Sequence, residues 1–336
     1  MRYLNRREVI EASGGLSPVE IVREALVLHA TQNTTLPEEA YLGWMTSSKH
    51  PARSLALPGA LWGSTPAIGL KVINSSLANV SRGVPRAQGL ILLFDRETAH
   101  PIGIMEAAYI SALRTSAYTA LSIDLLGVSS ACIGIIGCGA IGATHVRLLS
   151  GLYPNAEFLL YDQSPDRLRE FTNQQTSIGI RCEQAASAEH VVRGAQVIVT
   201  TTTTTTGYIP YEWILPGTLI AHVSLDDLLP SVIHSADLIV VDDWMLVSED
   251  ERRLLGRLHH AGEMVGPDAR VAEDAHNVSR VHTTLGDILR GAHTGRKLES
   301  EIIVSNPFGM GILDVAVASA TFKLAEMAGL GILIET

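Results

Sequence analysis

The chain has 336 residues, of which 46% are hydrophobic and 18% are charged, and its formal net charge is −10. This composition is typical of a well-buried α/β enzyme and excludes a disordered chain, and the length allows two domains of about 150 residues each. The acidic balance argues against a nucleic-acid partner, because no basic stripe is present to neutralise phosphates.

The first 126 residues predict a mixed domain of strands and helices. The start, MRYLNRREVI, has no apolar leader, and no run of about 18 apolar residues follows, so we expect a cytoplasmic protein without membrane contact. Residues 17–20, Ser-Pro-Val-Glu, predict a capping box that opens an amphipathic helix ending near His29. Further strands are expected at 67–73, 89–94 and 101–106, and a long apolar helix at about 111–126.

Residues 131–162 contain the clearest motif: a strand, a glycine-rich turn, a helix and a second strand that ends in an acid. Gly137 permits the tight turn, Gly139 lets the backbone approach a pyrophosphate, and Gly142 lets the helix pack close to the strand. The helix N-terminus faces the phosphates. Asp162 is placed to accept from ribose hydroxyls and would repel a 2′-phosphate, so NAD is predicted rather than NADP. The expected cofactor contacts are Gly137, Gly139, Ala140, Ile141, Gly142, Asp162, Thr115, Thr201 and Ser224.

Alternating strands and helices after this motif predict a parallel sheet, with strands at 156–161, 195–201, 218–223 and 237–241. The threonines at 200–206 are expected to finish one strand and form the loop at its carboxyl end; cofactor contacts and a composition accident both explain them. A strand at 301–305 and a closing helix at about 312–328 end the chain. We therefore predict an α/β fold, a Rossmann-type doubly wound parallel sheet (120–304) inserted into a discontinuous α+β substrate and dimerisation domain (1–119 and 305–336).

Two cations stand in apolar elements, Lys71 in a strand and Arg114 early in a helix. Such charges need a partner, which is either a protein acid or a substrate carboxylate. On the nucleotide side, Asp226 and Asp227 follow a strand, where an acid can exchange protons with an amine or activate water. The alternative for Asp226 is a helix N-cap. Further cations in the first domain are Arg53, and Arg82 and Arg86 in a polar loop where a solvated surface is the default.

The cysteines and histidines predict no metal site. Cys132, Cys138 and Cys182 form no CxxC pair, so free buried thiols in a reducing compartment are expected. The twelve histidines lack metal-ligand spacing, and His259 and His260 are expected on a solvated helix face.

Several segments together resemble the ornithine cyclodeaminase/μ-crystallin family over nearly the whole chain. They are GLKVI around Lys71, EAAYISALRTSA around Arg114, GCGAIG, LLYD, HVSLDD and LGDIL at 285–289. Within that family, the chain is similar to the branch that forms 2,3-diaminopropionate for siderophores and peptide antibiotics. The segments that indicate this branch are NVSRGVPRAQG, YDQ at 161–163, VDDW at 241–244 and EIIVSNPFGMGILD.

The resemblance implies NAD-dependent oxidative cleavage of N-(2-amino-2-carboxyethyl)-L-glutamate to L-2,3-diaminopropionate and 2-oxoglutarate, in a homodimer. It assigns the substrate-carboxylate residues to Arg53, Lys71 and Arg114 and the acid–base residue to Asp227. Because this substrate has three carboxylates, Arg82 and Arg86 are further candidates for binding it. Either Lys71 or Asp227 is expected to deprotonate the substrate amine. The competing hypotheses are an ornithine or lysine cyclodeaminase, a ketimine (pyrroline-carboxylate) reductase, and a non-catalytic sensor of NAD(H).

Overall fold

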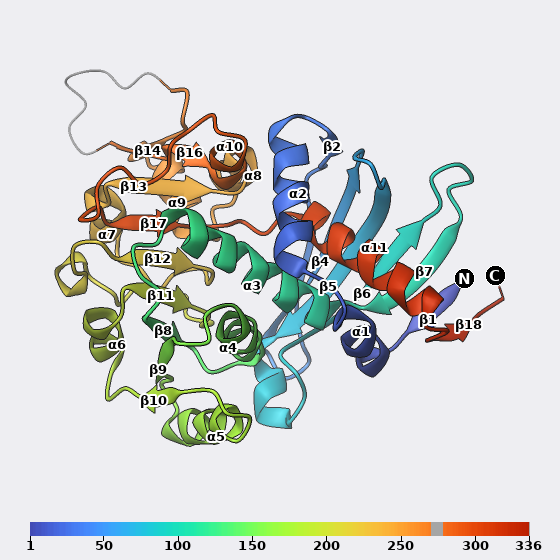
Figure 1. Cartoon of the computed structure of the whole chain (residues 1–336), viewed down its shortest axis with the longest axis horizontal. Coiled ribbons are helices and arrows are strands. Elements are labelled where there is room, and N and C mark those ends of the chain that lie inside the picture. The colour runs from blue at the N-terminus through green and yellow to red at the C-terminus, as the bar shows by residue number, and fades with distance from the viewer. Residues whose placement is uncertain (270–277, 336) are drawn as a thin grey trace. The chain divides into compact units, whose positions relative to one another are not determined.

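The computed structural model describes residues 1–269 and 278–335, and the chain separates into two compact units. Unit 1 contains Met1–Arg114 and Gly309–Thr336, and unit 2 contains Thr115–Phe308. In Figure 1, unit 1 includes the blue and red ends of the chain, and unit 2 runs from green to orange. The sequence placed the corresponding boundaries after residues 119 and 304.

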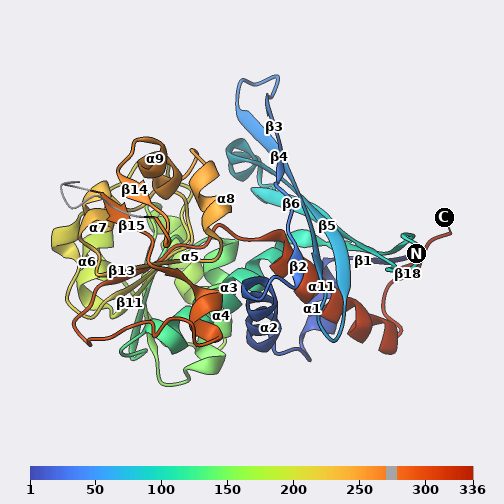
Figure 2. The same cartoon turned by 90° about the horizontal axis from the view of Figure 1, so that it is seen from above.

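Unit 1 is built on a largely antiparallel sheet in the order β18-β1-β7-β6-β5-β4-β2, with β3 paired to β4. The predicted strands β5, β6 and β7 are confirmed. Figure 2 shows β3 and β4 as a hairpin that extends beyond the other strands of this sheet. The strands are β1 (Arg2–Leu4), β2 (Thr34–Thr35), β3 (Ala40–Met45), β4 (Pro51–Leu61), β5 (Ala67–Ser76), β6 (Ala87–Phe94), β7 (Pro101–Glu106) and β18 (Ile332–Leu333).

Helices cover one face of this sheet, and among the described residues the other face has exposed apolar side chains. Helix α11 (Gly311–Met327) packs on β4, β5 and β6, and α1 (Arg6–Ser13) and α2 (Pro18–Ala30) pack on α11. Burial alternates along the strands as a one-sided sheet requires: Ile91 and Met105 are buried, whereas Leu90 and Ile102 are exposed. The 3₁₀ turn η1 (Leu77–Arg82) and the first turns of α3 (Ala107–Leu126) complete unit 1.

The start of α2 corrects one sequence prediction. Pro18 is the first helical residue, as expected, but the Ser17 side chain makes no capping hydrogen bond. The capping box lies instead at α1, where Asn5 accepts from the Glu8 N–H and the Glu8 carboxylate accepts from the Asn5 N–H. A Ser-Pro-x-Glu pattern does not determine the side-chain rotamer of the serine, so the helix was predicted correctly and its cap was not.

Unit 2 contains a fully parallel sheet in the order β10-β9-β8-β11-β12-β17-β13-β16, which confirms the Rossmann-type fold class. The predicted terminal strand β17 (Ile303–Ser305) enters this sheet between β12 and β13. The other strands are β8 (Cys132–Ile136), β9 (Glu157–Tyr161), β10 (Cys182–Gln184), β11 (Val197–Thr200), β12 (Leu219–His222), β13 (Leu238–Val241) and β16 (Thr283–Thr284), with β14 (Met264–Val265) and β15 (Ser279–Arg280) paired separately.

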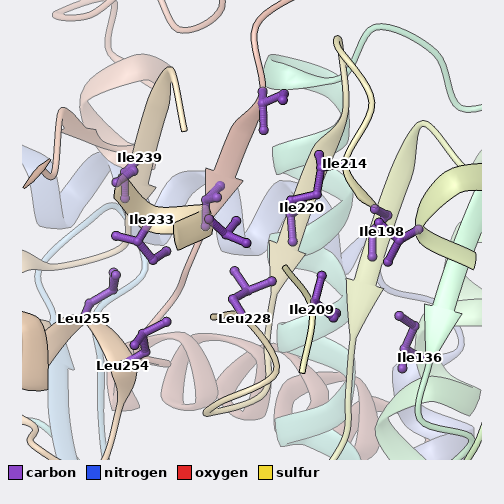
Figure 3. Close-up of a cluster of buried hydrophobic side chains, with 14 of the residues drawn as sticks. Ile136, Ile198, Ile209, Ile214, Ile220, Leu228, Ile233, Ile239, Leu254 and Leu255 are labelled. Atoms are coloured by element: carbon purple, nitrogen blue, oxygen red, sulfur yellow. The ribbon is translucent and has the colours of Figure 1, made fainter. Parts of the chain in front are cut away.

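Helices connect these strands on both faces, as parallel pairing requires. Figure 3 shows part of the core that they enclose, in which Ile198 and Ile220 of the sheet lie near Ile209 and Leu228 of the connecting segments. Each fully buried side chain of this size contributes about 1.5–3 kcal/mol to stability. The helices are α4 (Ala140–Leu152), α5 (Pro165–Thr176), α6 (Ala188–Gly194), α7 (Pro230–Ser235), α8 (Trp244–Glu249), α9 (Leu254–His260) and α10 (Leu285–Leu289), with the 3₁₀ turn η2 (Tyr211–Trp213).

The three cysteines agree with the sequence prediction in part. All three cysteines are free; Cys138 is buried, whereas Cys132 and Cys182 are partly exposed, so full burial was predicted correctly for only one of them.

His259 is partly buried and His260 is exposed, both on α9. No helix within the described part of the chain has the length and apolar character needed to cross a bilayer.

Candidate functional site

The glycine-rich turn of unit 2 has the geometry that its sequence predicts. Gly137 has φ +105°, and a Cβ there would lie 2.8 Å from the Thr201 carbonyl carbon. A Cβ on Gly142 would lie 2.4 Å from the Gly137 carbonyl oxygen. Both glycines are therefore required by the protein's own packing, since any side chain would force the turn, α4 or the β11 loop to move.

Gly139 differs from Gly137 and Gly142, because no described residue crowds the position that its Cβ would take. Its φ of −95° is ordinary, and a Cβ would meet no heavy atom within 4 Å. Gly139 is the N-cap of α4 without a side-chain cap, so the N–H groups of the first turn, including those of Ala140 and Ile141, lack partners within the helix. Open space at the Gly139 Cβ position, beside such donors, suits an anionic group such as a pyrophosphate.

Asp162 lies at the end of β9 and contacts the glycine turn. Its carboxylate accepts from the Cys138 N–H at 2.9 Å and from the Ser164 N–H at 2.9 Å. Arg167 Nη1 lies 3.7 Å from Asp162 Oδ1, and its side chain is half exposed. This arginine was not among the predicted site residues, although it stands five positions beyond the acid in the sequence.

The threonine stretch connects the glycine turn with Asp227. The threonine run begins in the strand and continues as a loop, as predicted, but β11 ends at Thr200 and not at residue 201. The Thr201 hydroxyl donates to the Gly137 carbonyl at 2.7 Å. The Thr202 hydroxyl donates to Asp227 Oδ1 at 2.9 Å. Thr204 and Thr206 hydrogen-bond within the loop. Specific positions, and not only strand-favouring composition, therefore explain the first threonines of the run.

Asp227 is buried and fixed by three hydroxyl groups. Tyr208 Oη donates to Oδ1 at 2.8 Å beside the Thr202 hydroxyl. The Ser224 hydroxyl makes a short hydrogen bond to Oδ2 and lies 2.7 Å from Thr200 Oγ1. Because a carboxylate only accepts, Ser224 donates to Asp227 and accepts from Thr200. Burial and the neighbouring Asp227 charge raise the pKa of Tyr208, so the phenol stays a donor.

His222 and Asp226 fix the backbone on either side of this carboxylate. His222 Nε2 accepts from the Asp227 N–H at 3.2 Å, and Nδ1 lies 3.2 Å from Asn306 Oδ1. Burial lowers the pKa of His222, so the ring is neutral with its proton on Nδ1. Asp226 pairs with Arg257, and the N-cap of α7 is Leu229. The N-cap alternative for Asp226 is therefore wrong.

Helix α3 contacts α4, the helix that follows the glycine motif. Thr115, an expected cofactor contact, is buried on α3. Ser116 and Thr119 of the same helix hydrogen-bond to the two ring nitrogens of His145 on α4, at 3.1 and 3.0 Å. Burial lowers the pKa of His145 to about 4, so a neutral ring joins α3 to α4.

In unit 1, the two cations of the apolar elements share one acid that the sequence analysis did not select. Lys71 Nζ donates to Asp314 Oδ2 at 2.6 Å, and Arg114 Nε donates to Asp314 Oδ1 at 3.2 Å. All three side chains are buried. Burial lowers the pKa of Lys71 to about 8; Asp314 opposes this change and Arg114 adds to it. Within this buried cluster, one carboxylate thus pairs with two cations.

Two of the remaining arginines lie close to each other on unit 1. Arg53 and Lys71 share the covered face of the sheet, because Arg53 pairs with Ser75 and Lys71 with Leu57. Arg53 Nε donates to Ser75 Oγ at 3.1 Å. Burial and the charge of Arg53 lower the pKa of Arg86. Arg82 is exposed and donates to Ser48 Oγ at 2.6 Å.

Sequence reasoning missed Asp314, Tyr208 and Asn306 among the residues that fix these groups. For Asp314 a signal was present, since it is a lone acid in the apolar run GILDVAVASA. The criterion that selected Lys71 and Arg114, a charge in an apolar element, applies to it equally. Tyr208 and Asn306 stand in loops without such a signal.

Known proteins share the sequence and the fold of this chain. A model of the ornithine cyclodeaminase/mu-crystallin family matches residues 19–327. N-((2S)-2-amino-2-carboxyethyl)-L-glutamate dehydrogenase of Staphylococcus aureus is 32% identical over 98% of this chain and 97% of its own. The crystal structure of CmnK superposes with a TM-score of 0.91 at 38% identity, over 100% of this chain and 98% of that one. An archaeal alanine dehydrogenase dimer with bound NAD has a TM-score of 0.83 at 27% identity, over 100% and 99%. The resemblance seen in the sequence is confirmed, and the chain belongs to the ornithine cyclodeaminase/mu-crystallin family.

Proposed function

We propose that the chain is an NAD-dependent dehydrogenase that cleaves N-(2-amino-2-carboxyethyl)-L-glutamate to L-2,3-diaminopropionate and 2-oxoglutarate, in siderophore or peptide natural-product biosynthesis. The observation that supports this most is the buried cluster of unit 1, in which two cations, Lys71 and Arg114, share the carboxylate of Asp314. A substrate with several carboxylates supplies further negative charge for these cations. The Staphylococcus aureus relative supports this particular substrate by its name.

The broader assignment, an oxidoreductase that uses NAD, has wider support. Two of the similar proteins above are dehydrogenases, and one of them has NAD bound. The residues present fit this cofactor, because the open position at Gly139 and the N-terminus of α4 suit a pyrophosphate. Asp162 would accept from the ribose hydroxyls. When bound, NAD⁺ supplies the hydride acceptor for oxidation of the carbon next to the substrate's secondary amine.

Asp162→Ser is expected to weaken discrimination against NADP by about tenfold or more. The substitution removes the charge that repels a 2′-phosphate, while Arg167 stays within reach to bind it. The ratio of kcat/KM with NAD⁺ to that with NADP⁺ measures the effect. Asp166→Ser is the matched control, because Asp166 is an exposed acid on α5 that pairs with Arg169. An unchanged ratio in Asp162→Ser would remove Asp162 from the nucleotide site.

The substrate's carboxylates are proposed to bind the cations of unit 1. Arg114 and Arg53 can each hold a carboxylate in a bidentate manner, and Arg86 lies near Arg53. Lys71 adds positive charge while protonated. Lys71 lies opposite Leu57, which is four residues, or about 13 Å, along β4 from Arg53. A single substrate can therefore contact both cations only if its carboxylates are far apart. Arg82, which is exposed, stays a candidate only for the outermost carboxylate.

Two proton-transfer groups complete the proposed reaction. The secondary amine must lose its proton before its lone pair can form the carbon–nitrogen double bond of a ketimine. We assign that step to Lys71, because its pKa of about 8 leaves a neutral amine accessible near physiological pH. Asp227, held by three hydroxyls, assists the addition of water to the ketimine carbon. Collapse of the carbinolamine then breaks the carbon–nitrogen bond and releases the two products.

The test of this function is net NADH release with a panel of amino acids. Purified chain and NAD⁺ are supplied with N-(2-amino-2-carboxyethyl)-L-glutamate, L-ornithine, L-lysine, L-proline or L-alanine. The proposal expects sustained NADH formation with the first compound at a kcat/KM at least tenfold above the others. Proline and ammonia from ornithine without net NADH would identify a cyclodeaminase, and oxidation of proline would identify a pyrroline-carboxylate reductase working in reverse.

A homodimer built through unit 1 belongs to the same proposal. The uncovered sheet face presents large apolar side chains, with Leu42 64% exposed and Trp44 45% exposed. Leu90 and Ile102 lie on the same face, opposite the one that α11 covers. A second copy is the partner that covers an identical face in a symmetric assembly. The free cysteines fit a reducing compartment, and we propose a cytoplasmic location.

Leu42→Glu combined with Trp44→Glu is expected to convert the dimer to monomer, because two charges would be buried without partners at the interface. Size-exclusion chromatography with light scattering should give twice the chain mass of 36.0 kDa for the wild type and one chain mass for the variant. Met327→Glu is the control, since Met327 is an 84% exposed apolar residue on α11. A monomeric wild type, or a double variant that stays dimeric, would contradict this interface.

A further inference from the structure

A buried cluster in unit 1 joins three elements that are far apart in the sequence. Asp314 of α11 accepts hydrogen bonds from Lys71 of β5 and from Arg114 of α3, and its side chain is 0% exposed. The Ser111 hydroxyl lies 3.3 Å from Lys71 Nζ and 3.5 Å from Arg114 Nη2. One carboxylate therefore holds both cations, and the Ser111 hydroxyl is the second group that contacts the two of them.

We propose that Asp314 is a positioning residue that orients Lys71 and Arg114 and sets the protonation state of the Lys71 amine. This inference rests on the proposed function, in which Lys71 accepts a proton and Arg114 binds a carboxylate. A buried carboxylate at 2.6 Å favours the ammonium form of the lysine. Without it, the Lys71 amine would be a weaker base and a poorer acceptor for the substrate's proton, and Arg114 would lose the bond to its Nε.

Three charged groups act on Lys71, and the sign of each charge determines the direction in which it shifts the pKa of the lysine. Asp314 from α11 and Glu39 from the segment before β3 favour the ammonium, whereas Arg114 from α3 disfavours it. Burial disfavours the ammonium more strongly than any of these charges, and the pKa settles at about 8 instead of 10.5. Neutralising Asp314 leaves burial and Arg114 opposed only by Glu39, so the pKa of Lys71 must fall further.

The test is a direct titration of Lys71 by NMR. The chain contains four lysines, Lys49, Lys71, Lys297 and Lys323, so ¹³C-lysine labelling gives few Cε signals, and the one missing in Lys71→Arg is that of Lys71. We expect a midpoint near pH 8 in the wild type and a midpoint about one pH unit or more lower in Asp314→Asn. Glu326→Gln, which removes an exposed acid from the same helix, should leave the midpoint unchanged.

An equal midpoint in Asp314→Asn and wild type would overturn the proposal. If Asp314→Asn does not fold, Arg114→Gln tests the same balance with the opposite sign: removal of the opposing cation must raise the midpoint, and no change overturns the proposal.

Turnover supplies a second readout. In Asp314→Asn, the acidic limb of the pH profile of kcat/KM should move to lower pH by the same amount as the NMR midpoint. A purely structural role would lower activity at every pH and leave the limb in place, which would overturn the proposal. Asp314→Glu should restore the limb. Absence of turnover by the wild type would refute the proposed function alone, because the NMR midpoints do not depend on the substrate.

Discussion

Lys71→Met is expected to lower kcat/KM for N-(2-amino-2-carboxyethyl)-L-glutamate by about a thousandfold or more. General-base catalysis contributes about 10²–10⁴-fold, and the variant also loses a positive charge that attracts the substrate's carboxylates. The fold should survive, because methionine fills a similar volume and Asp314 keeps its bond to Arg114. Initial rates of NADH formation measure the loss.

The pH dependence distinguishes a base from a residue that only binds. Because the Lys71 pKa is lowered to about 8 by burial, the neutral amine becomes more abundant as pH rises through that value. Wild-type kcat/KM should therefore increase up to about pH 8 and then level off, and the residual activity of Lys71→Met should lack this limb. Lys323→Met, which removes an exposed lysine of α11, is the control and should keep both the rate and the limb. Activity of Lys71→Met within tenfold of wild type would exclude Lys71 as the base.

Asp227→Asn is expected to lower kcat by about 10²–10⁴-fold with a smaller effect on KM. The amide has nearly the same shape and can still accept from the Tyr208 and Thr202 hydroxyls, so the loop should stay in place. An amide cannot exchange the proton that water addition requires. Steady-state kinetics at saturating NAD⁺ separate kcat from KM.

The neighbouring acid provides the matched control for Asp227. Asp226→Asn removes one charge at the adjacent position and weakens a bond to Arg257. Because Asp226 pairs with that arginine outside the hydroxyl network, its substitution should leave kcat within a few-fold of wild type. If Asp226→Asn lost more activity than Asp227→Asn, the acid–base role would belong to Asp226.

The fold could be predicted from the sequence because its signals are local. The glycine turn, the acid at the end of β9 and the alternating apolar segments of unit 2 each determine their own structure within about 30 residues. The same is true of the antiparallel strands β5, β6 and β7. The position of β17 between β12 and β13 could not be predicted, since an isolated apolar strand carries no information on its neighbours in a sheet.

The environment of the candidate residues could be predicted only in part. Lys71 and Arg114 stand out as charges in apolar elements, but their partner Asp314 lies 243 and 200 positions away, so only the folded chain brings it to them. The hydroxyls on Asp227 come from two loops whose paths no periodic pattern determines. Sequence reasoning therefore found the charged residues and left open whether protein or substrate neutralises them.

The most direct test of this account is the stoichiometry of one complete reaction, measured by mass spectrometry together with NADH absorbance. With N-(2-amino-2-carboxyethyl)-L-glutamate as the limiting reactant, we predict equal amounts of NADH, L-2,3-diaminopropionate and 2-oxoglutarate. Intact substrate and no NADH, with ornithine converted to proline and ammonia under the same conditions, would contradict the account and identify a cyclodeaminase.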